Sequence, residues 1–235
     1  VVACLVNGRP LAVDDLDRHA EAILETWYLG EQAGNALART VFGEVNPSGK
    51  LTLSFPKSAG HVPVYYSKKP SGRHTYLAED SSVLYPFGYG LSYTHFDYSP
   101  LTLDRDTGDC SHLALAGDSV QPGEAFRVSF SLTNTGQYKG EEIIQLYISD
   151  KTSSVTRPVK ELKGFKKVSL QPGESRNVEF TLSAGDLKFL NRQLQQVVEP
   201  GQFHIMIGSS SQDIRLRDVV TVAKQGKSRL IIPGS

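Results

Sequence analysis

A turn centred on Pro-Gly occurs three times in this chain, and each time alternating apolar residues follow it. The turns are Gln121–Glu124, Gln171–Glu174 and Glu199–Gln202. Pro-Gly at the centre suits type II geometry, because glycine adopts the positive φ that this turn requires. The alternation covers residues 126–132, 178–182 and 203–207. A period of two indicates strands with one buried face, so the pattern predicts three half-buried strands entered from hairpin-like turns.

Residues 142–149, 162–168 and 215–222 add further strand patterns, which gives about seven short strands between residues 97 and 224. Strands of this number and spacing predict an all-β sandwich of the immunoglobulin or fibronectin type III kind. Two sheets packed face to face form a complete core, so we expect this region to fold by itself.

The first part of the chain has a different pattern. Val1–Val6 is a continuous apolar run that stops in the turn Asn7–Pro10, as does a parallel strand buried on both faces. A short helical stretch with acids in its first turn follows from Asp14, and Ala22–Tyr28 predicts a second strand, joined to the first by a right-handed crossover.

A second helix is predicted to start at Gly30–Gln32 and to end at Gly43, before a third strand at Leu51–Phe55. Three strands and two helices cannot cover both faces of a parallel sheet. We therefore expect an α/β fragment whose remaining part is missing or replaced by another cover.

The segment Leu84–Tyr93, called the strap below, alternates aromatic residues with glycine and proline. Glycine lets the backbone approach a ring closely and proline fixes its direction, so the strap predicts one required conformation. A sugar platform and a clamp between domains are the two interpretations, and its position favours the clamp. The expected organisation is an α/β part at 1–66, a linker with the strap at 67–96, a fibronectin type III-like domain at 97–224 and a tail at 225–235.

Composition excludes several classes. Lys+Arg and Asp+Glu are equal at 25 each, so there is no net charge to attract nucleic acid. No apolar run approaches the roughly 20 residues of a membrane span, and the start lacks signal-peptide features. Cys4 and Cys110 have no metal-site spacing and are interpreted as free thiols, with a disulfide between them as the alternative.

Chemical motifs are weak. Gly43–Lys50 departs from a P-loop in length and order, and Gly88–Tyr93 lacks the strand-to-helix context of a dinucleotide site. Gly90–Thr94 lacks the closing glycine of a serine-hydrolase elbow. The histidines show no metal-ligand spacing; they are His19, His61, His74, His95, His112 and His204. We therefore expect no catalytic, cofactor-binding or metal residue in this chain.

Two further groups have structural interpretations. Glu31 follows Trp27, whose ring suits sugar stacking, but an acid in the first turn of a helix and a core tryptophan explain both residues. The basic cluster is interpreted as edge-strand lysines that discourage aggregation; it comprises Arg157, Lys160, Lys163, Lys166 and Lys167.

Seven segments together resemble the C-terminal part of a glycoside hydrolase family 3 β-glucosidase, of the bacterial periplasmic type. They are Val6–Leu11, Glu25–Tyr28, Gly34–Ala38, Phe42–Leu51, His61–Tyr66, the strap and Arg157–Phe165. The resemblance implies the C-terminal part of a family 3 α/β sandwich domain followed by a fibronectin type III-like domain. Leu29, where many relatives have proline or a small residue, and the short segment Ser67–Val83 depart from the family pattern.

The resemblance also implies a periplasmic or secreted enzyme of carbohydrate metabolism that retains configuration while hydrolysing terminal β-D-glucosyl residues, with β-xylosidase as the alternative within the class. Both catalytic carboxylates of the family come from regions upstream of Asn7–Pro10. Because retention needs two carboxyl groups, we expect this chain to be an incomplete family member, inactive without the missing N-terminal domains.

Two other roles stay open at this stage. One is a carbohydrate-binding module with sugar-stacking rings among Trp27, Tyr65, Tyr66, Tyr85 and Tyr89. The other is a purely structural role, in which the sandwich supports the α/β part.

Overall fold

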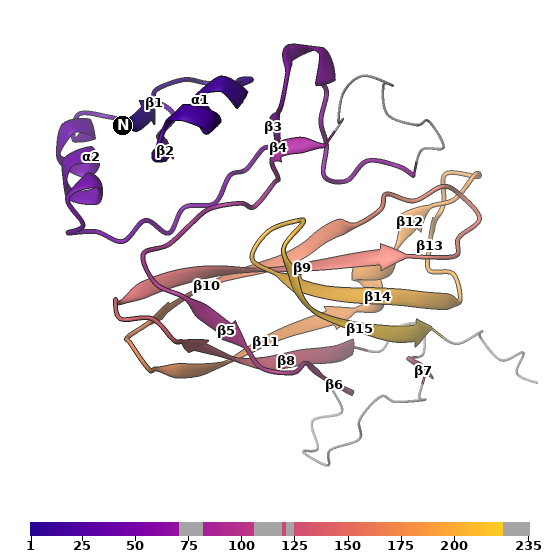
Figure 1. The fold of residues 1–235 in the computed structure, drawn as a ribbon. Helices are drawn as coiled ribbons and strands as arrows, with labels where there is room; N and C mark the ends of the chain where they lie inside the picture. The colour runs from indigo at the N-terminus through magenta and orange to yellow at the C-terminus, as the bar shows by residue number, and fades with distance from the viewer. Residues whose placement is uncertain (71–81, 106–118, 121–124, 223–235) are drawn as a thin grey trace, which may run out of the picture.

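The computed structural model describes residues 1–70, 82–105, 119–120 and 125–222. An α/β part formed by the first residues lies above a β-sandwich in Figure 1, and the strap runs between them. Cys110, His74, His112, the turn at 121–124 and the tail at 225–235 lie outside the described residues.

The α/β part contains a pair of parallel strands. β1 (Val2–Leu5) pairs with β2 (Ala22–Glu25) in the register Val2↔Ala22. The helix α1 (Asp14–His19) connects them, with three acids in its first turn and Arg18 and His19 in its last, which suits the helix dipole. The helix α2 (Ala33–Val41) follows, and Gly43 at φ 80° comes directly after the turn that ends it. The predicted strand, helix, strand, helix order is confirmed.

Two predictions in this part are wrong. The second strand ends at Glu25 and does not reach Tyr28, because Trp27 has a left-handed backbone with φ 53°. The third strand is only β3 (Phe55–Pro56), which pairs antiparallel with β4 (Val83–Tyr85) and does not join the parallel pair. A short 3-10 turn, η1 (Ala59–His61), lies between β3 and β4 in the chain.

The apolar surface of the α/β part is only partly covered. No residue of α1 or α2 is buried, and the ring of Phe42 is 82% exposed. Residues of β1 and β2 are exposed or half-buried, so the expectation that Val1–Val6 is buried on both faces is wrong for this chain. Parallel strands of α/β domains are normally covered on both faces, and these residues do not provide that cover by themselves.

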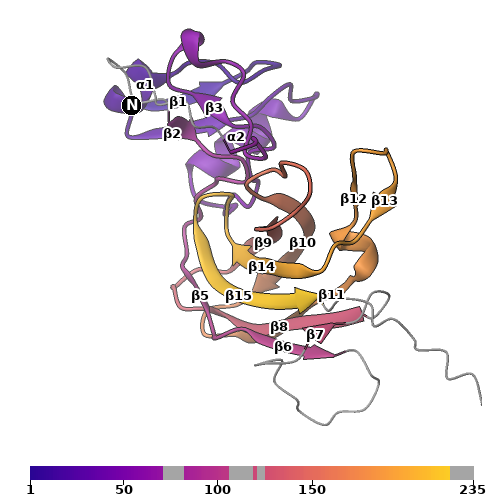
Figure 2. The same cartoon turned by 90° about the vertical axis from the view of Figure 1, so that its right-hand side faces the viewer.

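The sandwich consists of two sheets (Figures 1 and 2). One has the order β10-β9-β14-β15-β7, with β10 (Glu161–Leu170), β9 (Gly140–Asp150), β14 (Gly201–Gly208), β15 (Ile214–Val222) and β7 (Ser119–Val120). The other has the order β11-β8-β5, with β11 (Ser175–Ser183), β8 (Ala125–Asn134), β5 (Phe96–Tyr98) and, also against β8, β6 (Thr102–Arg105). The turn η2 (Ala184–Leu187) leads to a projecting hairpin of β12 (Phe189–Leu190) and β13 (Gln196–Val197).

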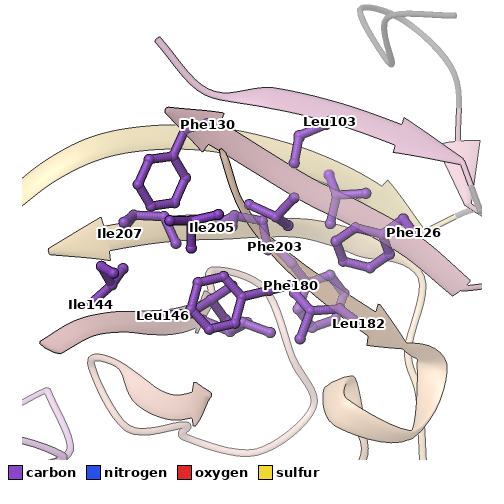
Figure 3. Packing of buried hydrophobic residues seen from close by; sticks show 14 of the residues in the cluster. Leu103, Phe126, Phe130, Ile144, Leu146, Phe180, Leu182, Phe203, Ile205 and Ile207 are labelled. Atoms are coloured by element: carbon purple, nitrogen blue, oxygen red, sulfur yellow. The ribbon is translucent and has the colours of Figure 1, made fainter. Parts of the chain in front are cut away.

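The core lies between these sheets. On β8, every second residue from Phe126 to Leu132 is buried, as the period of two predicts. Figure 3 shows Phe126 and Phe130 of β8 together with Leu146 of β9 and Ile205 of β14. The predicted half-buried strands and the sandwich are confirmed.

The Pro-Gly turns are more varied than predicted. At Gln171–Glu174, Gly173 has φ 76° and the Glu174 amide donates to the Gln171 carbonyl at 3.0 Å, as expected of a type II turn. This turn connects β10 to β11, which belong to different sheets, so it is a crossover and not a hairpin. Gly201 is the first residue of β14 and has no positive φ, so the prediction of type II geometry there is wrong.

Candidate functional site

The strap forms a tight turn at its centre. The Tyr89 amide donates to the Pro86 carbonyl at 3.1 Å, and Gly88 has φ 81°. Two backbone hydrogen bonds tie this turn to Leu51: the Leu51 amide donates to Tyr89 at 2.8 Å, and the Gly88 amide donates to Leu51 at 2.7 Å. Pro86 and Gly88 are buried. The strap therefore has the single conformation that its glycines and proline predict.

The turn directs the aromatic rings of the strap to two sides. Tyr85 and Tyr89 stack on each other at 5.4 Å, and Tyr85 contacts Phe55 edge-on at 6.1 Å. The Tyr85 hydroxyl donates to the carboxylate of Asp17 in α1. Burial, then the hydrogen bond to Asp17 and then the Asp17 charge raise the pKa of Tyr85 above its ordinary value. These two rings hold the strap to the α/β part.

Phe87 faces the sandwich. Its ring stacks on Tyr66 at 4.3 Å, and Tyr66 contacts the Tyr147 ring of β9 edge-on at 5.8 Å. The Ser211 amide donates to the Phe87 carbonyl at 2.9 Å, and the Tyr66 hydroxyl accepts a bond from the Leu162 amide at 3.3 Å. The strap is thus bonded on both sides, which agrees with the clamp interpretation.

Gln145 of β9 lies at the centre of this contact. Its Nε2 donates to the carbonyls of Gly88 at 3.0 Å and Ser209 at 2.8 Å, while its Oε1 accepts a bond from the Tyr147 hydroxyl. A Cβ on Gly88 would lie 2.0 Å from Gln145 Oε1. Position 88 therefore needs glycine for its positive φ and for its space.

A second contact comes from the run Asn46–Lys50. Asn46 Nδ2 donates to the Lys139 carbonyl at 3.0 Å, and its Oδ1 accepts from the Tyr93 amide at 2.8 Å. The Ser48 hydroxyl donates to Glu141 at 3.0 Å. The polar side chains of this run, which resembled a P-loop in composition only, thus contact the sandwich and the strap.

An ion pair is buried at the same place. Lys50 Nζ lies 3.4 Å from Glu142 Oε1 and donates to the Gly90 carbonyl at 2.9 Å. The side chains of Lys50 and Glu142 are only 10% and 5% exposed, and the Tyr98 hydroxyl donates to the same carboxylate at 3.1 Å. Burial raises the pKa of Glu142, and the Lys50 charge offsets part of that shift.

Glu31 does not lie in the helix position predicted for it. The helix α2 begins at Ala33, and its first turn contains no acid, so Glu31 is an exposed residue before the helix and the predicted first-turn position is wrong. Trp27 is half-buried and its ring contacts Phe55 at 6.2 Å, which supports the structural interpretation of that residue.

The described histidines and Cys4 do not come together in a common site. His19 Nδ1 lies 2.6 Å from the Asp15 carbonyl, and His61 lies in η1. Across the described residues, no group of three or more His, Cys, Asp and Glu side chains is arranged to hold a metal ion. Cys4 is an exposed free thiol.

Three residues of the basic cluster, Lys163, Lys166 and Lys167, lie on the edge strand β10, whereas Arg157 and Lys160 precede this strand. β10 is the terminal strand of the five-stranded sheet. Arg157 and Lys163 pair with Glu161, and Lys167 pairs with Glu141. Lys160 donates to the Ser211 carbonyl, and Lys166 lies over the Phe180 ring.

One exposed aromatic residue was missed by the sequence reasoning. Tyr28 is 79% exposed, and its ring lies over the backbone of Gly8, where an added Cβ would come within 2.7 Å of the ring. Glu25 accepts bonds from the amide of Trp27, the residue before Tyr28, at 3.0 Å and from Nδ2 of Asn7, the residue before Gly8, at 3.3 Å. In the sequence, Gly8 was the one residue that could have indicated this close approach of the ring.

Comparison with known proteins identifies both parts. The pattern of the glycosyl hydrolase family 3 C-terminal domain matches residues 1–93, and that of the fibronectin type III-like domain matches residues 142–211. No helix among the described residues is long and apolar enough to cross a membrane.

The relatives match almost the whole chain. A β-xylosidase of Formosa agariphila is 43% identical over 228 residues, which are 95% of this chain and 30% of the relative. A periplasmic β-glucosidase of Salmonella typhimurium is 44% identical over 226 residues, which are 92% of this chain and 28% of the relative. The crystal structure of a β-glucosidase from Listeria innocua in complex with glucose matches with a TM-score of 0.86 and 38% identity, over 95% of this chain and 31% of that one. The chain thus spans about 30% of the length of the relatives it matches.

Proposed function

Because the chain belongs to glycoside hydrolase family 3, we propose that it is the C-terminal region of a retaining β-glucosidase that removes terminal non-reducing β-D-glucosyl residues. The observation that carries the proposal is the extent of the match. Relatives named β-glucosidase or β-xylosidase match more than nine-tenths of the chain, across both domains and the strap.

In this proposal the two catalytic carboxylates come from a part of the polypeptide outside these residues. Retaining hydrolysis needs two carboxyl groups about 5–5.5 Å apart, one as nucleophile and one as acid/base. The two carboxylates where the α/β part meets the sandwich are paired with other side chains. Glu142 contacts Lys50 and Tyr98, and Glu141 contacts Ser48 and Lys167. The chain alone is accordingly proposed to be structural and inactive.

We also propose which residues form each domain. Residues 1–66 contribute the end of the α/β sandwich domain, residues 67–96 link it to the fibronectin type III-like domain at 97–224, and residues 225–235 are a tail. The strap and the run Asn46–Lys50 hold these domains at a fixed angle, through hydrogen bonds that would have to break together for the angle to change. We also propose a periplasmic or secreted location, by similarity to the Salmonella relative.

A glycan-binding module is less well supported. Of the rings considered for that role, Trp27, Tyr66, Tyr85 and Tyr89 are engaged with other rings, and Tyr65 is the exposed one at 65%. The β-xylosidase alternative has direct support from the Formosa relative and is separated from β-glucosidase by the choice of substrate.

A chimera tests the proposal. The chain replaces the matching C-terminal region of the Salmonella periplasmic β-glucosidase, and the hydrolysis of p-nitrophenyl β-D-glucoside and β-D-xyloside is measured. We expect turnover by the chimera, none by the chain alone and none by the relative with that region deleted. A folded but inactive chimera, or turnover by the chain alone, would contradict the proposal, and preference for the xyloside would favour the alternative.

A further inference from the structure

The exposed ring of Tyr28 lies against the backbone at a position without a side chain. It lies over Gly8, and a Cβ built on Gly8 would be 2.7 Å from Cε2 and 3.0 Å from the hydroxyl oxygen of Tyr28. The absence of a side chain at position 8 is therefore what lets the ring lie against the backbone. A single exposed aromatic residue is common on protein surfaces, but one that needs a glycine beneath it has a defined orientation.

The position of this ring in the sheet is informative. Gly8 comes after the end of β1 and Tyr28 comes after the end of β2, and these two strands are parallel. Both residues thus lie beyond the carboxyl ends of neighbouring parallel strands. Ligands of open α/β sheets bind outside these ends.

The backbone before Tyr28 is held in an unusual conformation. Trp27 has φ 53°, which is rare for a large side chain, and its amide donates to Glu25 Oε1 at 3.0 Å. The Thr26 hydroxyl donates to the Leu5 carbonyl at 2.7 Å, which joins this turn to the end of β1. As a result, two consecutive aromatic residues have different environments: Trp27 packs on Phe55, and Tyr28 stays 79% exposed.

Polar residues flank Gly8 in the chain, and Glu25 connects this segment to the residue before Tyr28. Asn7 and the exposed Arg9 are the chain neighbours of Gly8, and Asn7 Nδ2 donates to Glu25 Oε2 at 3.3 Å. Glu25 is half-buried, and each of its oxygens accepts one bond and retains a second lone pair. An exposed aromatic ring, with a carboxylate bonded to the residue before it and an amide on the residue before Gly8, matches the two surfaces of a pyranose, which are a C–H face and a rim of hydroxyls.

We propose that Tyr28, lying over Gly8, is a stacking platform for a pyranose unit of a β-glucoside. This inference rests on the proposed function and assigns a sugar contact to residues of this chain. In it, Glu25 and Asn7 are positioning residues, because they hold the turn that orients the ring.

The chain allows a direct binding test because Trp27, its single tryptophan, is adjacent to Tyr28. Tryptophan fluorescence of the 235-residue chain is followed during titration with methyl β-D-glucopyranoside and with cellobiose, up to about 100 mM. We expect a saturable change with a millimolar dissociation constant. Tyr28→Ala should weaken binding by about fivefold or more, and Tyr28→Phe should keep it within about twofold, because the ring face is what stacks.

Tyr138→Ala is the matched control, since Tyr138 is 61% exposed but lies between β8 and β9 of the sandwich. Its binding should equal that of the unchanged chain, and circular dichroism should show that each variant is folded. Absence of saturable binding by the unchanged chain, or equal affinity after Tyr28→Ala, would overturn the inference.

The two proposals can fail separately. Sugar binding that depends on Tyr28, together with an inactive folded chimera, would retain the platform and remove the proposed hydrolase function. An active chimera whose parent chain shows no binding through Tyr28 would do the reverse.

Discussion

The side-chain amide of Gln145 donates a 3.0 Å hydrogen bond to the backbone carbonyl of Gly88, and the Oε1 of that amide lies only 2.0 Å from the place where a side chain on Gly88 would carry its Cβ. One residue belongs to the central part of a sandwich sheet and the other to the turn of the strap. The two domains are therefore joined through a contact that depends on the absence of a side chain.

Gly88→Ala should destabilise the chain strongly. The new Cβ would collide with Gln145 Oε1 at 2.0 Å, and the residue would keep φ 81°, so we expect a loss of at least about 2 kcal/mol in the free energy of unfolding. Gly43→Ala is the matched control, because Gly43 has φ 80° and nothing within 4 Å of its Cβ position. It should cost only about 1 kcal/mol. Equal losses in denaturant unfolding would show that the collision contributes nothing.

Gln145→Ala should also weaken the fold. The change leaves the carbonyls of Gly88 and Ser209 and the hydroxyl of Tyr147 without their partner in a buried place. We expect a loss of about 2–3 kcal/mol, measured by urea unfolding, because unsatisfied buried polar groups carry their full desolvation cost. Gln193→Ala, at an exposed position in the β12–β13 hairpin, should change stability by less than about 0.5 kcal/mol. A similar loss in both variants would remove the special role of Gln145.

Lys50→Met should be more destabilising than the removal of a surface lysine. It leaves the Glu142 carboxylate, whose side chain is 5% exposed, without its cation, and we expect a loss of about 3 kcal/mol. Lys167→Met breaks a pair with Glu141 in which both side chains are exposed, at 51% and 39%, and should cost less than about 1 kcal/mol. If the two losses were the same, the Lys50–Glu142 pair would act like any surface pair.

The pH dependence of stability should change in the Lys50→Met variant. Burial raises the pKa of Glu142 from its ordinary 4.5, so between 4.5 and its folded value the folded state binds more protons than the unfolded state. The contribution of Glu142 to stability is therefore largest on the acid side of this window and falls as the pH rises through it. Removal of Lys50 raises the pKa further, so the variant should lose less stability at about pH 5 than at pH 7. Parallel curves of unfolding free energy against pH for the variant and the unchanged chain would contradict this.

The local pattern of apolar and polar residues was sufficient to predict most of the fold. On β8 and β11 the alternation of apolar and polar residues determines which side chains face the core, since a period of two places them on one face of any strand. The acids of α1 and the glycine after α2 likewise act on their own helices. The third strand could not be predicted, because β3 has two residues and its partner β4 lies more than 25 positions further along the chain.

The sequence by itself determined that the strap contains a sharp turn, because the positive φ open to glycine and the locked φ of proline are properties of single residues. It did not determine what the strap contacts. Gln145 meets Gly88 and Tyr66 meets Phe87 only after the two parts have folded, and Tyr28 meets Gly8 only because β1 and β2 pair in parallel. These contacts join residues about 20 to 60 positions apart, where no local periodicity connects them. The tertiary structure alone decided them, since they depend on burial and on the register of distant strands.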